Sequence, residues 1–150
     1  MRSGVRIGID VGTVRIGVAR SDFHGMLATP VETVARGADD IDRIKALVAE
    51  LDAFELIVGL PLALSGRQTA STDDALKFAD RLARVLSIDV RLVDERLSTV
   101  SAQAALRTSG RSTRTSRPVI DQVAAVIILQ HALDLERSRD TSPGVVVTPD

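Results

Sequence analysis

The stretch Val5-Arg6-Ile7-Gly8-Ile9-Asp10-Val11-Gly12-Thr13 places a carboxylate inside an apolar strand. Apolar side chains occupy every second position, so Asp10 lies on the opposite strand face from Ile9, close to the point where Gly12 lets the chain turn. An ionised carboxylate in the core of a sheet is costly unless a cation compensates it. The strand therefore predicts an Arg or Lys partner, or a metal ion, beside Asp10.

The composition is that of an ordinary globular domain, because 45% of the 150 residues are apolar and 26% are charged. There is no cysteine, which excludes disulfides, thiol catalysis and cysteine-ligated metal sites. No apolar run is long enough to span a membrane, and the chain enters its first strand without a signal peptide. We therefore expect a cytoplasmic protein without a membrane partner.

Short connections favour antiparallel pairing of the first three predicted strands, which cover residues 5–11, 14–21 and 27–35. Pro30 cannot donate a hydrogen bond to a sheet, which indicates that the third strand lies at an edge. The first part of the chain thus predicts a three-stranded meander.

Helices alternate with strands in the second part of the chain. A first helix begins at Asp39 or Asp40 and ends near Leu51, and a second one, capped by Ser71 and Asp74, extends to Leu86. Buried strands are expected over residues 56–60 and 90–94. This alternation predicts parallel pairing and a mixed α/β fold.

The rest of the chain is expected to hold two more helices and a loop. The third helix is predicted from Ser98 or Thr99 to about Arg107, and an exposed, mobile loop covers residues 108–117. Pro118 suits the first turn of a last, mostly buried helix. We expect a single domain over residues 1–138 and a flexible tail over residues 139–150.

Three carboxylates occur at the ends of buried elements, where folding does not need them: Asp10, Glu95 and Asp121. Several converging acids without a Cys or Ser nucleophile suit phosphodiester hydrolysis with two metal ions, for which Mg²⁺ or Mn²⁺ prefers oxygen ligands. Each acid also has a simpler interpretation. Asp121 could stabilise a helix dipole, and Glu95 could pair with Arg96 or another arginine. Asp94 is a candidate for a structural ion pair.

Positive charge is concentrated between Glu95 and Asp121, where the chain has no acidic residue. The net charge is only −1, so binding to a polyanion would need such a local patch. The alternative is a solvated loop. The arginines of this segment are Arg96, Arg107, Arg111, Arg114 and Arg117.

Five motifs in order resemble the YqgF/RuvX family, whose members are Holliday junction resolvase-like proteins and candidate nucleases for the 5′ end of pre-16S ribosomal RNA. The resemblance covers about Arg6 to Leu135. The motifs are Gly8-Ile9-Asp10-Val11-Gly12 with Arg15-Ile16-Gly17-Val18-Ala19, Ala28-Thr29-Pro30, Val58-Gly59-Leu60-Pro61-Leu62 with Gly66, Asp94-Glu95-Arg96-Leu97-Ser98-Thr99, and Asp121 with Ala124-Ala125 and Ile128-Leu129-Gln130.

The resemblance implies an RNase H-like fold with a five-stranded mixed sheet in the order 3-2-1-4-5 and helices on both faces. It also implies that Asp10, Glu95 and Asp121 are catalytic and bind Mg²⁺ or Mn²⁺. Many related nucleases carry an acid at the end of the fourth strand, whereas this strand ends in Gly59-Leu60-Pro61. Substrate contacts are expected from Thr13, Arg15, Gly59, Pro61 and the five arginines.

The resemblance implies nucleic acid as the partner, either an rRNA precursor or branched DNA, with ribosomal particles as further partners. A resolvase would need two active sites and hence a homodimer, whereas an RNA-maturing enzyme could be a monomer. Two other functions stay open. Residues 9–13 also resemble the first phosphate loop of actin-like ATPases, although no second loop follows. The second open function is that of a nucleic-acid-binding module without catalytic activity.

Overall fold

Alternating apolar side chains build the central strands of a mixed sheet. The computed structural model describes residues 1–96 and 113–149, and of residues 113–120 only the helical backbone. The strands are β1 (Val5–Val11), β2 (Arg15–Ser21), β3 (Ala28–Ala35), β4 (Ala53–Leu60), β5 (Asp89–Asp94) and β6 (Val145–Val146). The helices are α1 (Asp40–Glu50), α2 (Ala70–Val85) and α4 (Thr113–Arg139).

The described strands form one sheet in the order β3-β2-β1-β4-β5-β6. The first three strands pair antiparallel, β4 and β5 join them in parallel, and β6 closes the far edge antiparallel to β5. The predicted order 3-2-1-4-5 is confirmed. β3 is an edge strand, and Pro30 lies at a register shift against Ala19, where a missing N–H is tolerated.

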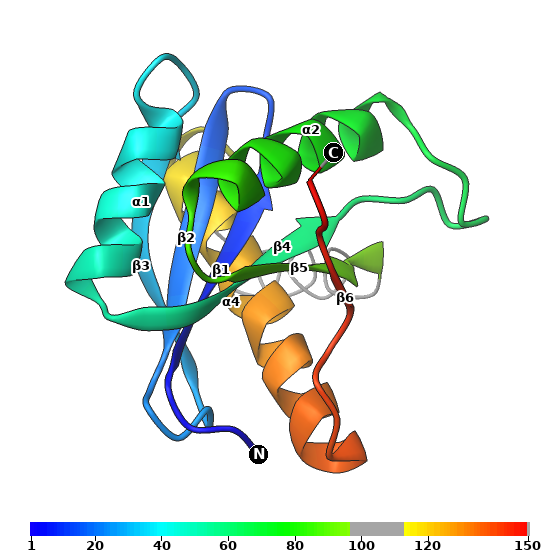
Figure 1. The fold of residues 1–150 in the computed structure, drawn as a ribbon. Helices are drawn as coiled ribbons and strands as arrows, with labels where there is room; N and C mark the ends of the chain where they lie inside the picture. Colours follow the sequence, from blue (N-terminus) through cyan, green and yellow to red (C-terminus); the bar gives the residue numbers. More distant parts are fainter. Residues whose placement is uncertain (97–112, 150) are drawn as a thin grey trace.

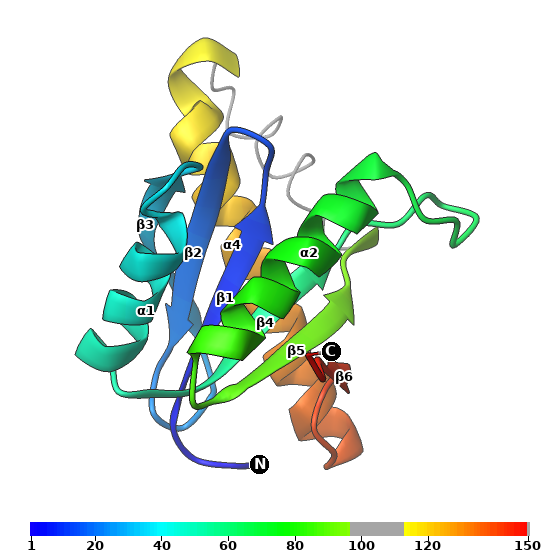
Figure 2. The same ribbon diagram turned by 45° about the horizontal axis from the view of Figure 1, so that its top comes forward.

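Helices cover both faces of the sheet, as predicted. Figures 1 and 2 show α1 and α2 over one face and α4 over the other. The first face is packed by side chains such as Ile7, Ile9 and Phe78, and the second by Ala125, Ile128 and Leu129 of α4 against Ile57. Because Asp10 alternates with Ile9, it lies on the face that α4 covers.

Besides the earlier start of β4, three local predictions differ from the structure. The helix α2 is capped by Thr69, whose hydroxyl accepts the Thr72 N–H, while the Thr72 hydroxyl accepts the Thr69 N–H. The predicted cap at Ser71 and Asp74 is therefore wrong, because two hydroxyls satisfy the helix start as well as a hydroxyl and an acid do. β4 begins three residues earlier than predicted, at Ala53.

The second difference concerns the last helix. α4 begins at Thr113, so residues 113–117 are helical rather than part of a loop. Pro118 lies in its second turn, where it lacks the N–H that would bond to the carbonyl of Arg114. Helix propensity is a weak guide, and a proline need not mark the first turn. The predicted third helix and the rest of the loop lie outside the described residues.

The third difference is a sixth strand. Val145–Val146 pair with Arg91 and Leu92 of β5, and the Val147 N–H donates to the Val90 carbonyl at 2.8 Å. Part of the segment predicted as a tail thus closes the sheet edge, and the division into a domain over 1–138 and a tail stays a prediction. Among the described residues, no helix is long and apolar enough to cross a membrane.

Candidate nuclease site

Asp10 and Asp121 come together on the face of the sheet that α4 covers. Asp10 pairs in register with Gly17 of β2, and a Cβ atom at Gly17 would lie 1.9 Å from the Asp121 carbonyl oxygen. The absence of a side chain at Gly17 therefore lets the start of α4 approach the sheet beside Asp10. The close approach is supported by Gln122, whose amide donates to the Thr33 hydroxyl at 3.0 Å.

The electrostatics of Asp10 reflect this neighbourhood. Burial raises the pKa of Asp10 to about 6, and repulsion by the Asp121 carboxylate adds to the shift. A raised pKa means that the protein around Asp10 disfavours its charged form. A cation placed between the two carboxylates would reverse this effect.

Glu95 follows the last residue of β5 and lies on the same face. Its side chain is buried, and a Cβ atom at Gly59 would lie 2.3 Å from its Oε2 atom and 2.6 Å from Ile128 of α4. The Glu95 N–H donates to the Leu60 carbonyl at 3.2 Å, which ties the end of β5 to the end of β4. Gly59, predicted to contact substrate, thus makes room for the Glu95 carboxylate.

Carboxylate oxygens are the donors that Mg²⁺ and Mn²⁺ prefer, so the chemistry of these acids fits the predicted ions. Within residues 1–96 and 113–149, however, no group of three or more His, Cys, Asp or Glu lies close enough to hold a metal ion. The structure brings Asp10 and Asp121 together. The binding of metal ions by all three acids, Asp10, Glu95 and Asp121, stays a prediction.

Among the described residues, Arg15 is a cation that contacts Asp121. Its Nε atom donates to Oδ2 of Asp121 at 2.8 Å, and its side chain is partly exposed. The sequence predicts a substrate contact for Arg15, and the structure gives it a carboxylate partner at the site. Thr13 is exposed in the turn between β1 and β2, which is closed by a hydrogen bond from the Gly12 N–H to the Arg15 carbonyl.

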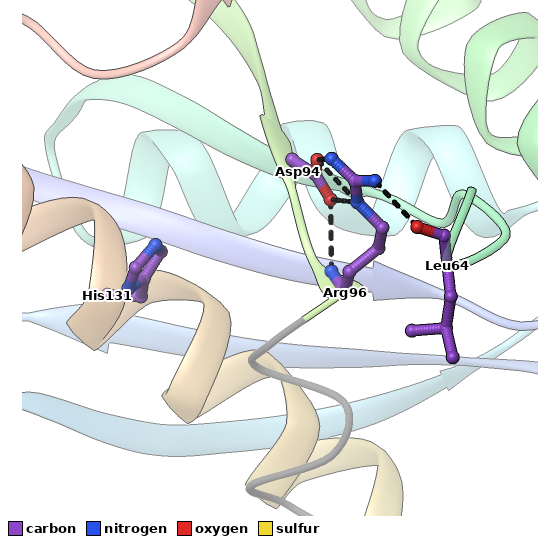
Figure 3. A pocket seen from close by; sticks show the side chains of 4 residues that line it. All are labelled: Leu64, Asp94, Arg96 and His131. Atoms are coloured by element: carbon purple, nitrogen blue, oxygen red, sulfur yellow. Dashed lines mark hydrogen bonds and ion pairs between the residues drawn. The ribbon is translucent and has the colours of Figure 1, made fainter. Parts of the chain in front are cut away.

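Arg96 also has a carboxylate partner. Figure 3 shows its guanidinium group against Asp94, with Nε 2.8 Å from Oδ2, while Nη1 donates to the Leu64 carbonyl at 3.2 Å. The predicted structural ion pair of Asp94 is confirmed. Pro61 accepts a hydrogen bond from the Thr72 hydroxyl and thereby anchors the loop after β4 to α2.

The other predicted arginines cannot be placed. Arg107 and Arg111 lie outside the described residues, and Arg114 and Arg117 lie in the part of α4 of which only the backbone is described. The predicted positive patch therefore stays a prediction.

A family model described as RuvX, Holliday junction resolvase, matches residues 4–135. The chain belongs to the RuvX family. A relative from Clavibacter michiganensis subsp. michiganensis, named as a candidate pre-16S rRNA nuclease, is 65% identical over 98% of this chain and 93% of its own length. A relative of the same name from Leifsonia xyli subsp. xyli is 64% identical, over 99% of this chain and 97% of its own.

Solved structures support the fold of this RuvX-family chain. RuvC from Thermus thermophilus, solved in complex with a Holliday junction substrate, superposes with a TM-score of 0.61 at 19% identity, over 95% of this chain and 99% of RuvC. A second Thermus thermophilus RuvC structure gives a TM-score of 0.54 over the same shares. The predicted RNase H-like fold is confirmed, with six described strands rather than five.

Sequence reasoning missed one residue that shapes the site of this RuvX-family protein. Arg36 donates to the Gly12 carbonyl at 2.7 Å and to both carboxylate oxygens of Asp74 at 2.8 and 3.0 Å. It thereby fixes the turn after Asp10 to the start of α2. No local pattern predicts these contacts of Arg36, because Gly12 and Asp74 are distant from it in sequence.

Proposed function

We propose that this chain is a metal-dependent nuclease that hydrolyses phosphodiesters in structured nucleic acid and matures the 5′ end of pre-16S rRNA in the cytoplasm. Membership of the RuvX family supports the nuclease class, and the names of the relatives support the rRNA substrate. The observation that supports the metal dependence is the buried Asp10 beside Asp121, where burial, together with repulsion by the Asp121 carboxylate, raises the pKa of Asp10.

In this proposal Asp10, Glu95 and Asp121 hold one or two Mg²⁺ or Mn²⁺ ions. When bound, the ions supply an activated water and neutralise charge on the phosphate. Arg15 orients the Asp121 carboxylate through the 2.8 Å contact. Arg36 holds the Gly12 turn, so that the end of β1 is rigid where a phosphate would approach.

Cleavage assays test this proposal. The substrates are a precursor of 16S rRNA and a four-way DNA junction, each with Mg²⁺, with Mn²⁺ or with EDTA. We expect the wild-type protein to cut the RNA with metal only, Asp10→Asn to lose at least about a hundredfold in rate, and Asp42→Asn to cut normally. Asp42 is an exposed acid of α1 and provides a matched control. Equal cutting by Asp10→Asn would refute the catalytic assignment.

Resolution of branched DNA is the second candidate function, because the family description and the RuvC fold both favour it. Preferred cutting of the junction over the RNA would select it. A resolvase must also cut two strands, so we would then expect a homodimer on the junction in analytical ultracentrifugation. Monomeric cutting of the RNA alone would select rRNA maturation.

The arginine segment has a separate test. Replacing Arg111 and Arg114 by Gln removes charges predicted to neutralise phosphates. We expect weaker RNA binding and a log–log salt slope lower by about 0.7–0.9 for every phosphate that the variant no longer neutralises. An unchanged salt slope would show that these two arginines do not contact phosphates of the RNA.

A further inference from the structure

A pocket lies beside the candidate site, at the end of β5. It has a volume of about 400 Å³ and is lined by Leu64, Asp94, Arg96 and His131, which come from the loop after β4, the end of β5 and α4 (Figure 3). Asp94 and His131 also line an adjoining cavity of about 510 Å³. We call the two together the edge pocket. The volumes lie in the range of small-molecule sites.

Among the residues that the structure describes, those that line the edge pocket are mainly aliphatic, and the polar ones are Asp94, Arg96 and His131. Beyond Asp94 and His131, the adjoining cavity is lined by Leu60, Leu92, Val93, Leu135, Gly144 and Val145. Aliphatic walls accept the flat face of an aromatic ring, and a few fixed polar groups orient it. The chain has few aromatic residues, so such walls would replace stacking on Phe, Tyr or Trp.

The Asp94 and Arg96 ion pair fixes the rim of this pocket. Besides its contacts with Asp94, Arg96 donates from Nη1 to the Leu64 carbonyl at 3.2 Å. The loop that carries Leu64 is closed by hydrogen bonds from the Ala63 N–H to the Arg67 carbonyl at 2.9 Å and from the Gly66 N–H to the Ala63 carbonyl at 2.7 Å. Leu64 is thus held at the rim although 83% of it is exposed.

The polar groups of the edge pocket match the edge of a nucleobase. The Asp94 carboxylate is fixed at the pocket rim by hydrogen bonds from Nε and Nη2 of Arg96. A carboxylate oxygen accepts several hydrogen bonds, so Asp94 is also suited to accept one from an N–H donor of a base. Figure 3 shows His131 across the pocket from Asp94, where an imidazole can stack on a base or bond to it.

The position of the pocket links it to the proposed reaction. Asp94 and Glu95 are consecutive, and Glu95 is tied to Leu60, another residue of the edge pocket. If one phosphate of a nucleic-acid strand lay at the three acids, a neighbouring nucleotide of that strand would lie at the edge pocket. We propose that the edge pocket binds one unpaired nucleobase of the substrate strand, next to the phosphodiester that is cut. This inference rests on the proposed nuclease function.

Binding measurements test the pocket without cleavage. In an Asp10→Asn background, fluorescence anisotropy follows a labelled RNA hairpin with a single-stranded 5′ extension, and a series of the same RNA with one abasic residue at each position in turn. We expect Leu64→Ala to weaken binding of the intact RNA by about fivefold or more, the lower end of what one stacked base contributes. Leu27→Ala is the matched control, because Leu27 is also exposed and directly precedes β3, whose first residue pairs with Ser21 at the end of β2 that lies away from the candidate site.

The abasic series separates base binding from a general effect on the fold. At one position of the series, the missing base should abolish the difference in RNA affinity between the Leu64→Ala protein and its parent. The loss of affinity in His131→Ala should depend on the same position. A loss that persists with every abasic RNA, or no loss at all, would overturn the nucleobase assignment and leave the nuclease proposal intact. If the variants lose RNA affinity at one position of the series but the wild-type protein cuts neither substrate, only the nuclease proposal is refuted.

Discussion

The environment of Asp10 in the folded protein disfavours the charged form of its carboxylate. Its pKa is about 6, against 3.8 for an unperturbed Asp, because burial and Asp121 disfavour ionisation. Between these two values the folded state binds more protons than the unfolded state. This group therefore favours folding below about pH 4, and its contribution is lost as the pH rises through about 6.

The first prediction concerns Asp10→Asn without metal. Because Asn cannot ionise, we expect the variant to gain stability over the wild type by on the order of 1–3 kcal/mol as the pH rises from 4 to 7. Urea unfolding in EDTA at several pH values measures this difference, with Asp42→Asn as control. A pH-independent difference would contradict the shifted pKa. Added Mg²⁺ should raise the stability of the wild type more than that of the variant.

The second prediction concerns Gly17, which has no chemical role of its own. In Gly17→Ala the new Cβ would lie 1.9 Å from the Asp121 carbonyl oxygen, so α4 must shift away from β2. We expect a loss of about 2–4 kcal/mol in the free energy of unfolding. The rate of nucleic-acid cleavage should fall as well. Gly37→Ala is the control, because a Cβ there meets nothing within 4 Å. Equal stability of the two variants would show that Gly17 does not set the position of α4.

At the scale of the elements, the strands were the most predictable part of the chain. The alternating pattern of β1 predicts its bounds and the face of Asp10, because a strand covered by helices must repeat its side chains every second residue. The start of α2 was predicted two residues late, since the pairing of Thr69 with Thr72 lacks the usual acid. The contact of Arg36 with Gly12 could not be predicted, because nothing local records a long-range partner.

β6 was missed for a related reason. Val145–Val146 lie between prolines in a polar segment, and their strand conformation depends on pairing with β5, more than fifty residues earlier. A two-residue strand carries no periodic signal of its own. Of the candidate site, the sequence predicts the strand face of Asp10 and names Glu95 and Asp121 as further candidate acids, but it could not predict that Arg15 pairs with Asp121.

The third prediction removes β6 by ending the chain after Ser142. The Val147 N–H bond to Val90 and the pairing with Arg91 and Leu92 are then absent. We expect a loss of about 1–2 kcal/mol in the free energy of unfolding and faster hydrogen exchange in β5. Amides of β3, the opposite edge, serve as the internal reference in the same experiment. Unchanged exchange in β5 would mean that β6 does not protect this edge.

At the scale of the whole molecule, the two ends of the sheet differ in their charge. The candidate site lies at the end of β1 where Asp10 and Asp121 repel each other. At the opposite end, buried carboxylates are fully paired with arginines: Glu55 contacts Arg2 and Arg91, and Glu136 contacts Arg2 and Arg6. These pairs join the start of the chain to α4. Buried charge is therefore compensated by arginines at this end of the sheet, whereas at the other end the charged form of Asp10 is disfavoured.

The fourth prediction tests this connection with Glu136→Gln. Glu136 contacts Arg2 at 2.6 Å and Arg6 at 2.8 Å, and its side chain is only 4% exposed. Burial opposes its ionisation, but hydrogen bonds from Arg2 and the charge of Arg6 outweigh burial and hold the pKa of Glu136 below its usual range. Its contribution is therefore present above the unfolded pKa and is lost as the pH falls.

At neutral pH we expect Glu136→Gln to lower the free energy of unfolding by about 3–5 kcal/mol, because the variant leaves the buried Arg6 without its carboxylate. Asp134→Asn is the control on the same helix, since Asp134 is 60% exposed and pairs with Arg137 at the surface. Its effect should stay within about 0.5 kcal/mol and vanish at high salt, whereas the loss in Glu136→Gln should persist. Similar losses in both variants, measured by urea unfolding, would show that the buried network does not tie the N-terminus to α4.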